Sequence, residues 1–278
     1  MKTKLKFYNR AYKEIKKGFL RVYFFLEIKL LRFLHFTFKA KIYKKKNKIS
    51  LLCPTKNRSK KFERFSQSLI DKTQYLDRIE LLICFDIVED ELEDYRKTLQ
   101  NLSKKGILIK KFFVNLKTHA LRNNFLVKNS TGDIIFPVND DLILLSRNWD
   151  NIIDDEFSSI DPANPFCVWV NCDRKYKNLD YSAFPIINRV WYNKLNYIVP
   201  EYFKFWYLDW WICDVARRSK KYFLSNVSIH QFHADKFKNE IDSTHKLNST
   251  KENLDHDYNM WLKTLNYRIQ DSIKINSN

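Results

Sequence analysis

Glycine is scarce in this sequence, with three among 278 residues. No G-x-G-x-x-G and no G-x-x-x-x-G-K-[ST] pattern occurs, so a glycine-rich loop for a dinucleotide or a P-loop triphosphate is excluded. The first eighteen residues are mostly basic and polar and contain no apolar core of a signal peptide, so we expect no cleaved leader.

Cysteine is also sparse, and its five copies are an odd number. Cys167 and Cys172 form a C-x₄-C spacing that lacks the second ligand pair of a zinc site. Several of the cysteines lie in apolar runs typical of core strands. We therefore expect free thiols in a reducing compartment, which predicts a cytoplasmic protein. The five are Cys53, Cys84, Cys167, Cys172 and Cys213.

The formal net charge is +18, but the excess of positive charge is confined to one end. Residues 1–50 hold sixteen Lys and Arg against two acids, whereas the remaining chain holds 34 basic against 30 acidic residues. A nucleic-acid-binding protein would carry its basic surface on the folded body. We therefore expect a nearly neutral body and no nucleic-acid partner.

The basic end has the periodicity of an amphipathic helix. Its charge-free stretches are far shorter than the ~20 residues needed to cross a bilayer. A helix with bulky apolar residues on one face and Lys and Arg on the rest suits an anionic membrane surface, although it could equally pack on the protein's own body. We predict that residues 1–48 are a membrane-surface arm, which places the protein at the inner face of the membrane. The apolar positions are Tyr12, Ile15, Phe19, Val22, Tyr23, Leu26, Leu30, Phe33 and Leu34.

After Lys48 the pattern changes to short apolar strands that alternate with polar helices, which predicts an α/β fold with a mostly parallel sheet flanked by helices. We expect strands at 49–53, 80–85, 107–114 and 134–138, and helices at 62–72, 91–104 and 120–130. The predicted domain spans residues 49–240, and residues 241–278 form a C-terminal helical extension.

Three segments of the body carry conspicuous polar motifs. The first follows the first strand, the second runs from a helix start through a buried strand into two acids, and the third combines an apolar strand with an acid among aromatic residues. In order they are C-P-T-K-N-R at 53–58, L-R-N-N at 121–124 with S-T-G-D-I-I-F-P-V-N-D-D at 130–141, and F-P-I-I-N-R at 184–189 with W-Y-L-D-W-W at 206–211.

This order and spacing resemble the family 2 glycosyltransferases, which have the GT-A fold. The resemblance covers roughly residues 49–235. Trp149-Asp150 also resembles a motif found in a subset of that family. The resemblance implies transfer of a sugar from a nucleotide-diphosphate donor to an acceptor hydroxyl, with inversion at the anomeric carbon. The implied partners are a nucleotide sugar and an acceptor glycan or glycolipid, and the implied cofactor is Mn²⁺ or Mg²⁺.

The acids at the end of the buried strand are the expected site of that metal. Hard divalent cations take oxygen ligands, and a cation can stabilise a departing diphosphate as a Lewis acid. Asp141 is the predicted metal ligand. Asn139 stands where the family usually has the first Asp of its DxD motif, so with Asp140 it is assigned to the nucleotide. By itself N-D-D would also suit an ordinary acidic turn.

The loop after the first strand lies where open α/β sheets bind ligands. Pro54, Thr55 and Asn57 are predicted to contact the base or ribose, and Arg58 to reach a phosphate. The alternative is a plain strand exit with a solvated arginine.

Two residues are assigned to the nucleotide from the strand and helix that follow. Asp86, at the end of the second strand, is predicted to contact the base, or alternatively to cap a helix. Arg122 is assigned to the donor from the R-N helix.

The resemblance implies that Asp209 is the general base. Burial among tryptophans would raise the pKa of its carboxyl group. The alternative is a helix N-cap. A histidine after the strand at 225–229 is implied to complete the metal shell, with His230 preferred and His233 second.

Two other functions stay open from the sequence alone. One is a non-catalytic sugar-nucleotide-binding relative, which would explain Asn139, and the other is a basic nucleic-acid-binding protein. A nucleotidyltransferase on a related fold would need a glycine-rich loop that residues 54–58 lack.

Overall fold

The computed structural model describes residues 46–172, 181–231 and 242–277. Residues Lys41–Asn278 form one compact unit by themselves. Almost the whole predicted arm and His233 lie outside the described residues. Within the described ranges, no helix has the length and apolar content to cross a membrane.

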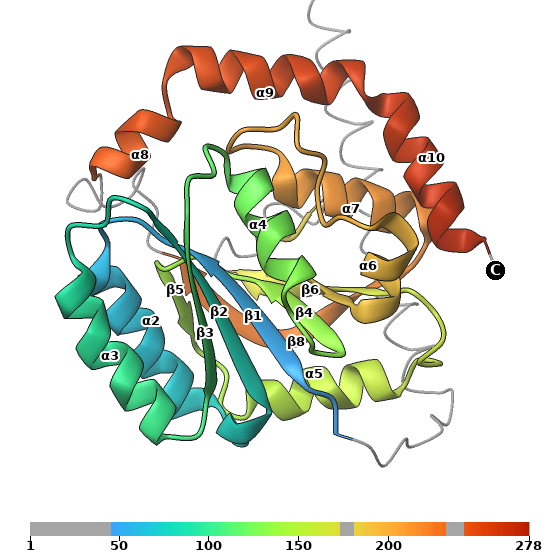
Figure 1. The fold of residues 1–278 in the computed structure, drawn as a ribbon. Coiled ribbons are helices and arrows are strands. Elements are labelled where there is room, and N and C mark those ends of the chain that lie inside the picture. Colours follow the sequence, from blue (N-terminus) through green and yellow to red (C-terminus); the bar gives the residue numbers. More distant parts are fainter. Residues whose placement is uncertain (1–45, 173–180, 232–241, 278) are drawn as a thin grey trace, which may run out of the picture. The chain divides into compact units, whose positions relative to one another are not determined.

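The centre of the fold is a sheet in the order β3-β2-β1-β4-β7-β6-β8-β5 (Figure 1). Strands β3, β2, β1 and β4 are mutually parallel, whereas β7 pairs antiparallel with β4 and β6, and β5 pairs antiparallel with β8. The strands are β1 Ile49–Pro54, β2 Ile79–Asp86, β3 Leu108–Val114, β4 Ile134–Pro137, β5 Leu142–Leu144, β6 Cys167–Cys172, β7 Pro185–Asn188 and β8 Tyr222–Gln231.

Helices cover both faces of the sheet, and a short 3₁₀ turn, Leu76–Arg78, precedes β2. The α/β expectation is therefore confirmed, and the first three predicted helices occur within a few residues of their predicted bounds. The helices are α2 Ser59–Lys72, α3 Leu92–Lys104, α4 His119–Lys128, α5 Trp149–Ser158, α6 Arg189–Leu195, α7 Leu208–Ser219, α8 Ser243–Asn248, α9 Lys251–Lys263 and α10 Leu265–Asn276.

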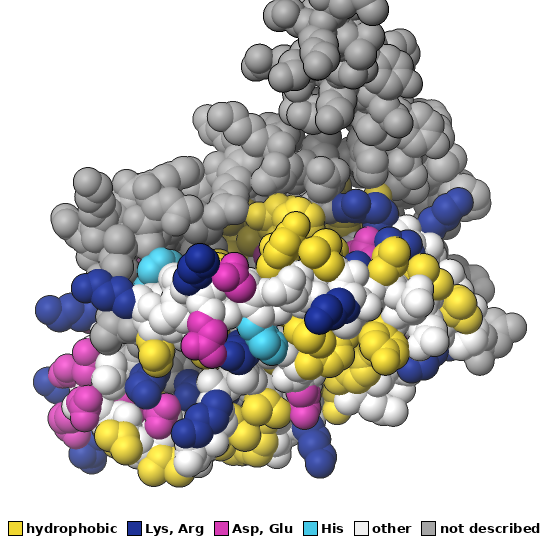
Figure 2. Space-filling view, turned by 90° about the horizontal axis from the view of Figure 1, so that it is seen from above, with side chains coloured by type: hydrophobic (Ala, Val, Ile, Leu, Met, Phe, Trp, Pro, Cys, Tyr) yellow, Lys and Arg dark blue, Asp and Glu magenta, His cyan; other side chains and the backbone are white. Residues whose placement is uncertain are grey.

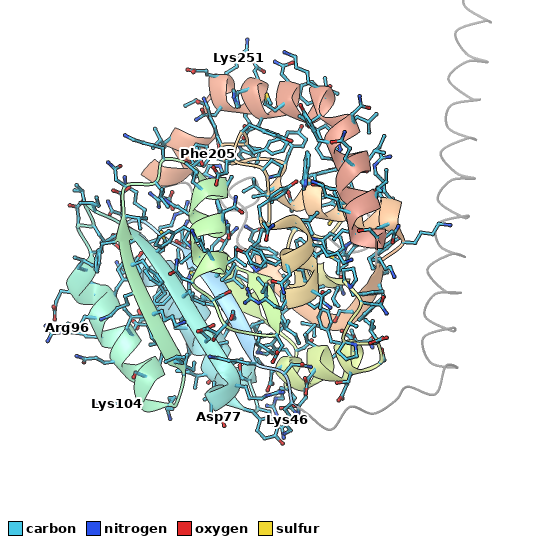
Figure 3. The ribbon with its side chains drawn as sticks, turned by 45° about the vertical axis from the view of Figure 1, so that its right-hand side comes forward. Lys46, Asp77, Arg96, Lys104, Phe205 and Lys251 are labelled. Carbon is cyan, nitrogen blue, oxygen red and sulfur yellow. The ribbon has the colours of Figure 1, made fainter. Side chains whose placement is uncertain are left out.

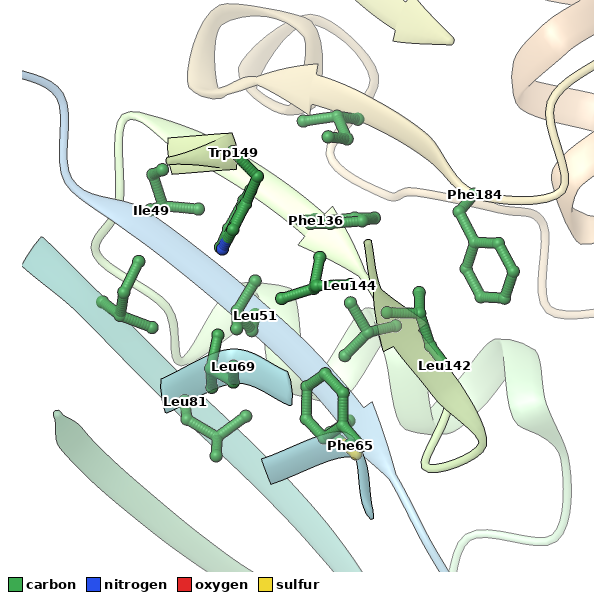
Figure 4. Close-up of a cluster of buried hydrophobic side chains, with 14 of the residues drawn as sticks. Ile49, Leu51, Phe65, Leu69, Leu81, Phe136, Leu142, Leu144, Trp149 and Phe184 are labelled. Carbon is green, nitrogen blue, oxygen red and sulfur yellow. The ribbon is translucent and has the colours of Figure 1, made fainter. Parts of the chain in front are cut away.

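Successive residues of a strand point to opposite faces, and this alternation builds two cores. Leu51 and its neighbours pack against α2, α3 and α5, with Phe65, Leu69 and Trp149 fully buried (Figure 4). Leu52, one position later, belongs to the second core under α4, α6, α7 and α10. The continuous apolar runs of β1 and β2 reflect burial on both faces.

The start of β4 explains the G-D pair of its motif. A Cβ at Gly132 would lie 2.5 Å from Ser50 Oγ and 2.7 Å from Ser50 N, so only glycine fits against β1. Asp133 accepts a hydrogen bond from the backbone N–H of Lys48 at 3.0 Å. The pair therefore sets the register that brings residues 138–141 to the end of β1.

The W-D motif at 149–150 is structural as well. Trp149 is buried and donates from Nε1 to Thr73 Oγ1 at 2.8 Å. Asp150 is buried, accepts from the backbone N–H groups of Gln74 and Tyr75, and pairs with Arg78 at 2.9 Å. This cluster fixes the start of α5 against the turn after α2.

The C-terminal helices are joined to α7 by buried polar contacts. Arg268 pairs with Asp214 at 2.8 Å, and Asp271 accepts a hydrogen bond from Trp211 Nε1 at 3.2 Å. In Figure 1, α9 and α10 arch over the top and right of α4, α6 and α7. The predicted C-terminal extension therefore packs on the same body as the sheet.

Candidate active site

A cleft of about 1120 Å³ opens at the carboxyl ends of β1, β2 and β4. Its lining brings together most of the residues predicted from sequence, which come from segments up to 155 positions apart. The predicted residues that line it are Pro54, Thr55, Arg58, Asp86, Arg122, Asn139, Asp140, Asp141 and Asp209. Asn57 and His230 do not line it.

Asp140 is a buried carboxylate whose two oxygens already have partners. Thr55 Oγ1 donates to Oδ2 at 2.7 Å, and Arg58 Nη1 donates to Oδ1 at 3.1 Å. Tyr95 supports this arrangement, because its hydroxyl lies 2.7 Å from Thr55 Oγ1 and accepts from the backbone N–H of Arg58 at 2.9 Å. Asp140 thus organises the first loop from behind.

Asp141, the next acid in this turn, also lines the cleft and accepts fewer side-chain hydrogen bonds than Asp140 does. Gln231 Nε2 donates a hydrogen bond to Asp141 Oδ1 at 3.3 Å. Burial and the adjacent Asp140 carboxylate raise the pKa of Asp141 to about 6, although Arg58 opposes the shift. Because ionisation of Asp141 costs free energy in this environment, a nearby positive charge would stabilise its ionised form.

Arg58 connects Asp140 to the C-terminal helices. It forms a 2.8 Å ion pair with Asp242, which Lys61 also contacts at 2.8 Å. Burial lowers the pKa of Arg58, but Asp140 and Asp242 outweigh burial and raise it. Asp242 also caps α8 by accepting from the backbone N–H of His245 at 2.7 Å.

A second group of charges lies at the end of β2. Asp86 accepts from Lys56 Nζ at 3.0 Å and from Arg122 Nη2 at 2.9 Å. Burial alone would raise the pKa of Asp86, but Lys56, the backbone N–H of Val88 and Arg122 lower it. The helix-cap alternative for Asp86 is wrong, because the next helix begins at Leu92 with Glu91 at its N-cap.

Asn57 has a local role in this loop. Its φ is 48°, in the left-handed region where asparagine is favoured, and its amide nitrogen donates to Asp90 at 3.1 Å. Its backbone N–H donates to Glu89 at 2.9 Å. These contacts join the first loop to the loop after β2 instead of pointing into the cleft.

Asp209 lines the cleft from the first turn of α7. Its carboxylate accepts from the backbone N–H of Trp210 at 2.9 Å. The N-cap position belongs to Tyr207, at φ 65°, so the N-cap alternative for Asp209 is wrong. The expected enclosure among tryptophans is also wrong: Asp209 is half-buried, because Trp210 faces outward while Trp211 packs in the core.

The β8 strand is longer than the sequence suggested, and this changes which side chain meets Asp141. It extends to Gln231, so His230 lies within the strand opposite Ile143. Neighbouring residues of a strand alternate between faces, and it is Gln231 that contacts Asp141. Among the described residues, no group of three or more His, Cys, Asp or Glu side chains is arranged to hold a metal.

Two histidines that line the cleft were missed by the sequence reasoning. His119, the first residue of α4, is adjacent to Arg122, and burial followed by the charges of Arg122 and Arg58 lowers its pKa to about 4. His245 lines the cleft from α8. His119 lies two residues before the L-R-N-N motif and could have been found there, whereas nothing in the sequence connects His245 to the site.

Comparison with known proteins supports this architecture. No known protein-family model and no curated protein sequence matches the chain. Among solved structures, the mannosyltransferase PcManGT from Pyrobaculum calidifontis, in complex with GDP-Man and Mn²⁺, has a TM-score of 0.54 at 11% identity over 92% of this chain and 81% of that one.

Two further structures are similar. TarS 1–349 of S. aureus with UDP gives a TM-score of 0.53 at 14% identity, covering 76% of this chain and 72% of that one. GalNAc-T7 with UDP, GalNAc and Mn²⁺ gives 0.54 at 13% identity, covering 67% of this chain and 43% of that one. All three are glycosyltransferases, and the chain has their GT-A nucleotide-sugar transferase fold.

Proposed function

We propose that the protein is a glycosyltransferase that moves a sugar, in the simplest case a hexose, from a nucleotide-diphosphate donor to an acceptor hydroxyl. The observation that carries this proposal is the set of side chains that the cleft brings together. Asp141 and the cations Lys56, Arg58 and Arg122 line it from the part of the chain up to residue 141, and Asp209 lines it from the first turn of α7. Such a set suits a reaction in which an anionic leaving group departs and a proton is removed from the attacking hydroxyl.

The donor side would bind the nucleotide and its phosphates. Arg122 and Lys56 converge on Asp86 at the edge of the cleft, and Arg58 lies beside Asp140. Guanidinium groups are well suited to phosphate oxygens because they offer paired donors. Asp86 would accept from the base, and the amide of Asn139 would contact a ribose hydroxyl.

The residues present fit a divalent cation that is held partly by substrate. Asp140 is committed to Thr55 and Arg58, which leaves Asp141 as the available carboxylate, with the side-chain amide of Gln231 donating to it from Nε2. Mg²⁺ is usually bound by one or two carboxylates together with substrate phosphates. When bound, Mn²⁺ or Mg²⁺ would supply Lewis-acid stabilisation to the departing diphosphate. Asp141 would orient the donor through that ion.

Asp209 would act as the general base. It would accept the proton of the acceptor hydroxyl as the hydroxyl attacks the anomeric carbon from the face opposite the diphosphate, which gives inversion. Its position in the first turn of α7 favours a carboxylate, because the helix N-terminus carries partial positive charge. The contact with the Trp210 N–H would fix the direction of the carboxylate.

The acceptor would be a glycan or a membrane glycolipid, and the protein would work at the cytoplasmic face of the membrane. The support for this part is the sequence of residues 1–48, with its basic charge and its apolar periodicity.

The direct test is release of nucleoside diphosphate from UDP-, GDP- and CDP-linked sugars in the presence of Mn²⁺. Water can replace the acceptor hydroxyl, so slow release is expected without an acceptor. Asp141→Ala should abolish it. A wild-type protein that binds these donors but releases no diphosphate, even with a glycan acceptor, would instead be a non-catalytic relative.

A further inference from the structure

Four aromatic side chains gather at the acceptor side of the cleft. They are Tyr181, Tyr207, Trp210 and Tyr258, called here the aromatic platform, and all line the cleft near Asp209. Tyr181 stacks on Trp210 with ring centroids 4.4 Å apart and an interplanar angle of 22°. Tyr207 lies 6.4 Å from Trp210 and 6.3 Å from Tyr258. The rings therefore form one continuous surface.

The platform is held rigidly from behind. Trp261 of α9 stacks on Tyr207 at 5.6 Å and meets Trp210 edge-on at 6.1 Å. The buried carboxylate of Asp257 accepts from the backbone N–H groups of Lys204, Phe205 and Trp206 at 2.8 to 2.9 Å. Figure 3 labels Phe205 in this loop, beneath α9, which begins at Lys251. The rings are thus fixed before any ligand arrives.

The platform is nevertheless open to solvent. Trp210 is 37% exposed and Tyr258 is 50% exposed, although both lie among other aromatic rings. Figure 2, which looks onto this end of the molecule from above, shows hydrophobic side chains gathered among the charged ones. Exposed aromatic groups at the mouth of a polar cleft are typical of a binding site.

The charges around the platform restrict the ligand. The basic residues that line the cleft, Lys56, Arg58, Lys117 and Arg122, all precede β4 in the chain. From Tyr181 onward, the described lining residues include Asp209 and Asp255 but no Lys or Arg. Among these described residues, a polyanionic acceptor would therefore meet two carboxylates and no Lys or Arg.

We propose that the aromatic platform binds a pyranose ring of a neutral glycan acceptor by stacking against its C–H face. Ring C–H groups carry slight positive charge and meet the negative face of an aromatic ring favourably. The position of Trp210 directly after Asp209 places the stacked sugar next to the base. This inference rests on the proposed function, since it names the acceptor class of the same cleft.

The test uses the full-length protein and cellotriose, a neutral β-linked glucose trimer, in saturation-transfer NMR. Magnetisation should pass from the protein's aromatic rings to the sugar C–H groups. Trp210→Ala and Tyr258→Ala should each weaken binding by roughly 3- to 10-fold, the range of an aromatic contact. Trp210→Phe should retain most of it. The matched control is Tyr267→Ala, because Tyr267 is 57% exposed on α10 and does not line the cleft.

Glycerol 3-phosphate serves as the competing probe, because it is an anionic polyol without a ring. Preferential binding of glycerol 3-phosphate, no transfer to cellotriose, or equal transfer in Trp210→Ala and wild type would each overturn the inference. Binding of UDP and GDP with Mn²⁺ is measured on the same samples. Diphosphate binding without cellotriose binding would refute the acceptor assignment alone, whereas cellotriose binding without diphosphate binding would refute the proposed function and the acceptor assignment with it.

Discussion

Arg58 forms an ion pair with Asp242, 184 positions later in the chain, at 2.8 Å. The same guanidinium contacts Asp140 at 3.1 Å. Through this one side chain, the beginning of α8 is connected to the turn that precedes Asp141. The C-terminal helices therefore contribute to the donor side of the cleft as well as to the aromatic platform.

The Asp242 contacts predict a specific pH dependence of stability. Burial would raise the pKa of Asp242, but Arg58, Lys61 and the His245 N–H lower it from 3.8 to about 2. A carboxyl group with a depressed pKa stabilises the folded state above its unfolded pKa, and this stabilisation is lost as the pH falls through the folded pKa. The stabilisation is therefore present above about pH 4 and lost towards pH 2.

Asp242→Asn should lower the free energy of unfolding at neutral pH by at most about 2 kcal/mol, and solvent screening should reduce this value. Urea unfolding measured from pH 5 to pH 2 should show a shallower loss in the variant than in wild type. Parallel curves for the two proteins would contradict the ion-pair account.

Asp257 should be important for stability because it is fully buried and accepts three backbone N–H groups. Asp257→Asn keeps the size but turns part of the acceptor into a donor, so we expect a loss of about 3 kcal/mol. Glu252→Gln, an exposed position in the same helix, should change stability by less than about 0.5 kcal/mol. Equal stability of the two variants in urea unfolding would show that the 204–206 loop does not depend on Asp257.

The arm prediction is tested with liposomes. Full-length protein should sediment with anionic vesicles and be released as salt rises, because surface attraction is screened over a Debye length of about 8 Å at physiological ionic strength. A variant lacking residues 1–45 should remain folded and stay in the supernatant. Sedimentation that is unaffected by the deletion would locate the membrane contact elsewhere.

The parallel half of the fold was predictable from sequence because each strand and helix there has a distinct local pattern. Leu51 and Leu52 show the principle, since consecutive apolar residues in β1 indicate burial on both faces. The second half was harder to predict. Short strands such as β5 and β7 carry little periodicity, and their antiparallel pairing depends on contacts between distant segments.

The lining of the cleft was predictable where one motif held several of its residues. Thr55, Arg58 and Asp140 line it because their motifs stand at strand ends. Gln231 was missed because the strand was expected to end at residue 229, with His230 as the first residue after it. The strand β8 continues to Gln231, so His230 and Gln231 point to opposite faces. Asp242 and Tyr258 could not be found from sequence at all, since their roles arise from the packing of α8 and α9.

Asp209→Asn should separate catalysis from binding. The substitution keeps the size and the hydrogen bond to the Trp210 N–H but removes the proton acceptor, so the rate of sugar transfer should fall about 10²- to 10⁴-fold. The affinity for nucleoside diphosphate should change little, because the proposed donor contacts come from Lys56, Arg58, Arg122 and Asp141 and not from Asp209. Transfer at the wild-type rate would remove Asp209 from the mechanism, and the base would then have to be another cleft carboxylate, such as Asp255.

The central claim is that the cleft binds a nucleoside diphosphate through Asp141 and a divalent cation, and thermal unfolding tests it most directly. UDP, GDP, CDP and ADP are each added with Mn²⁺ or with a chelator, and ligand binding to the native state raises the unfolding temperature. We expect at least one diphosphate to stabilise the wild-type protein with Mn²⁺ and much less with chelator. Asp141→Ala should lose this effect while remaining folded, and Asn139→Asp, which adds a carboxylate, should strengthen it. Equal stabilisation with Mn²⁺ and with chelator, or none by any diphosphate, would contradict the account.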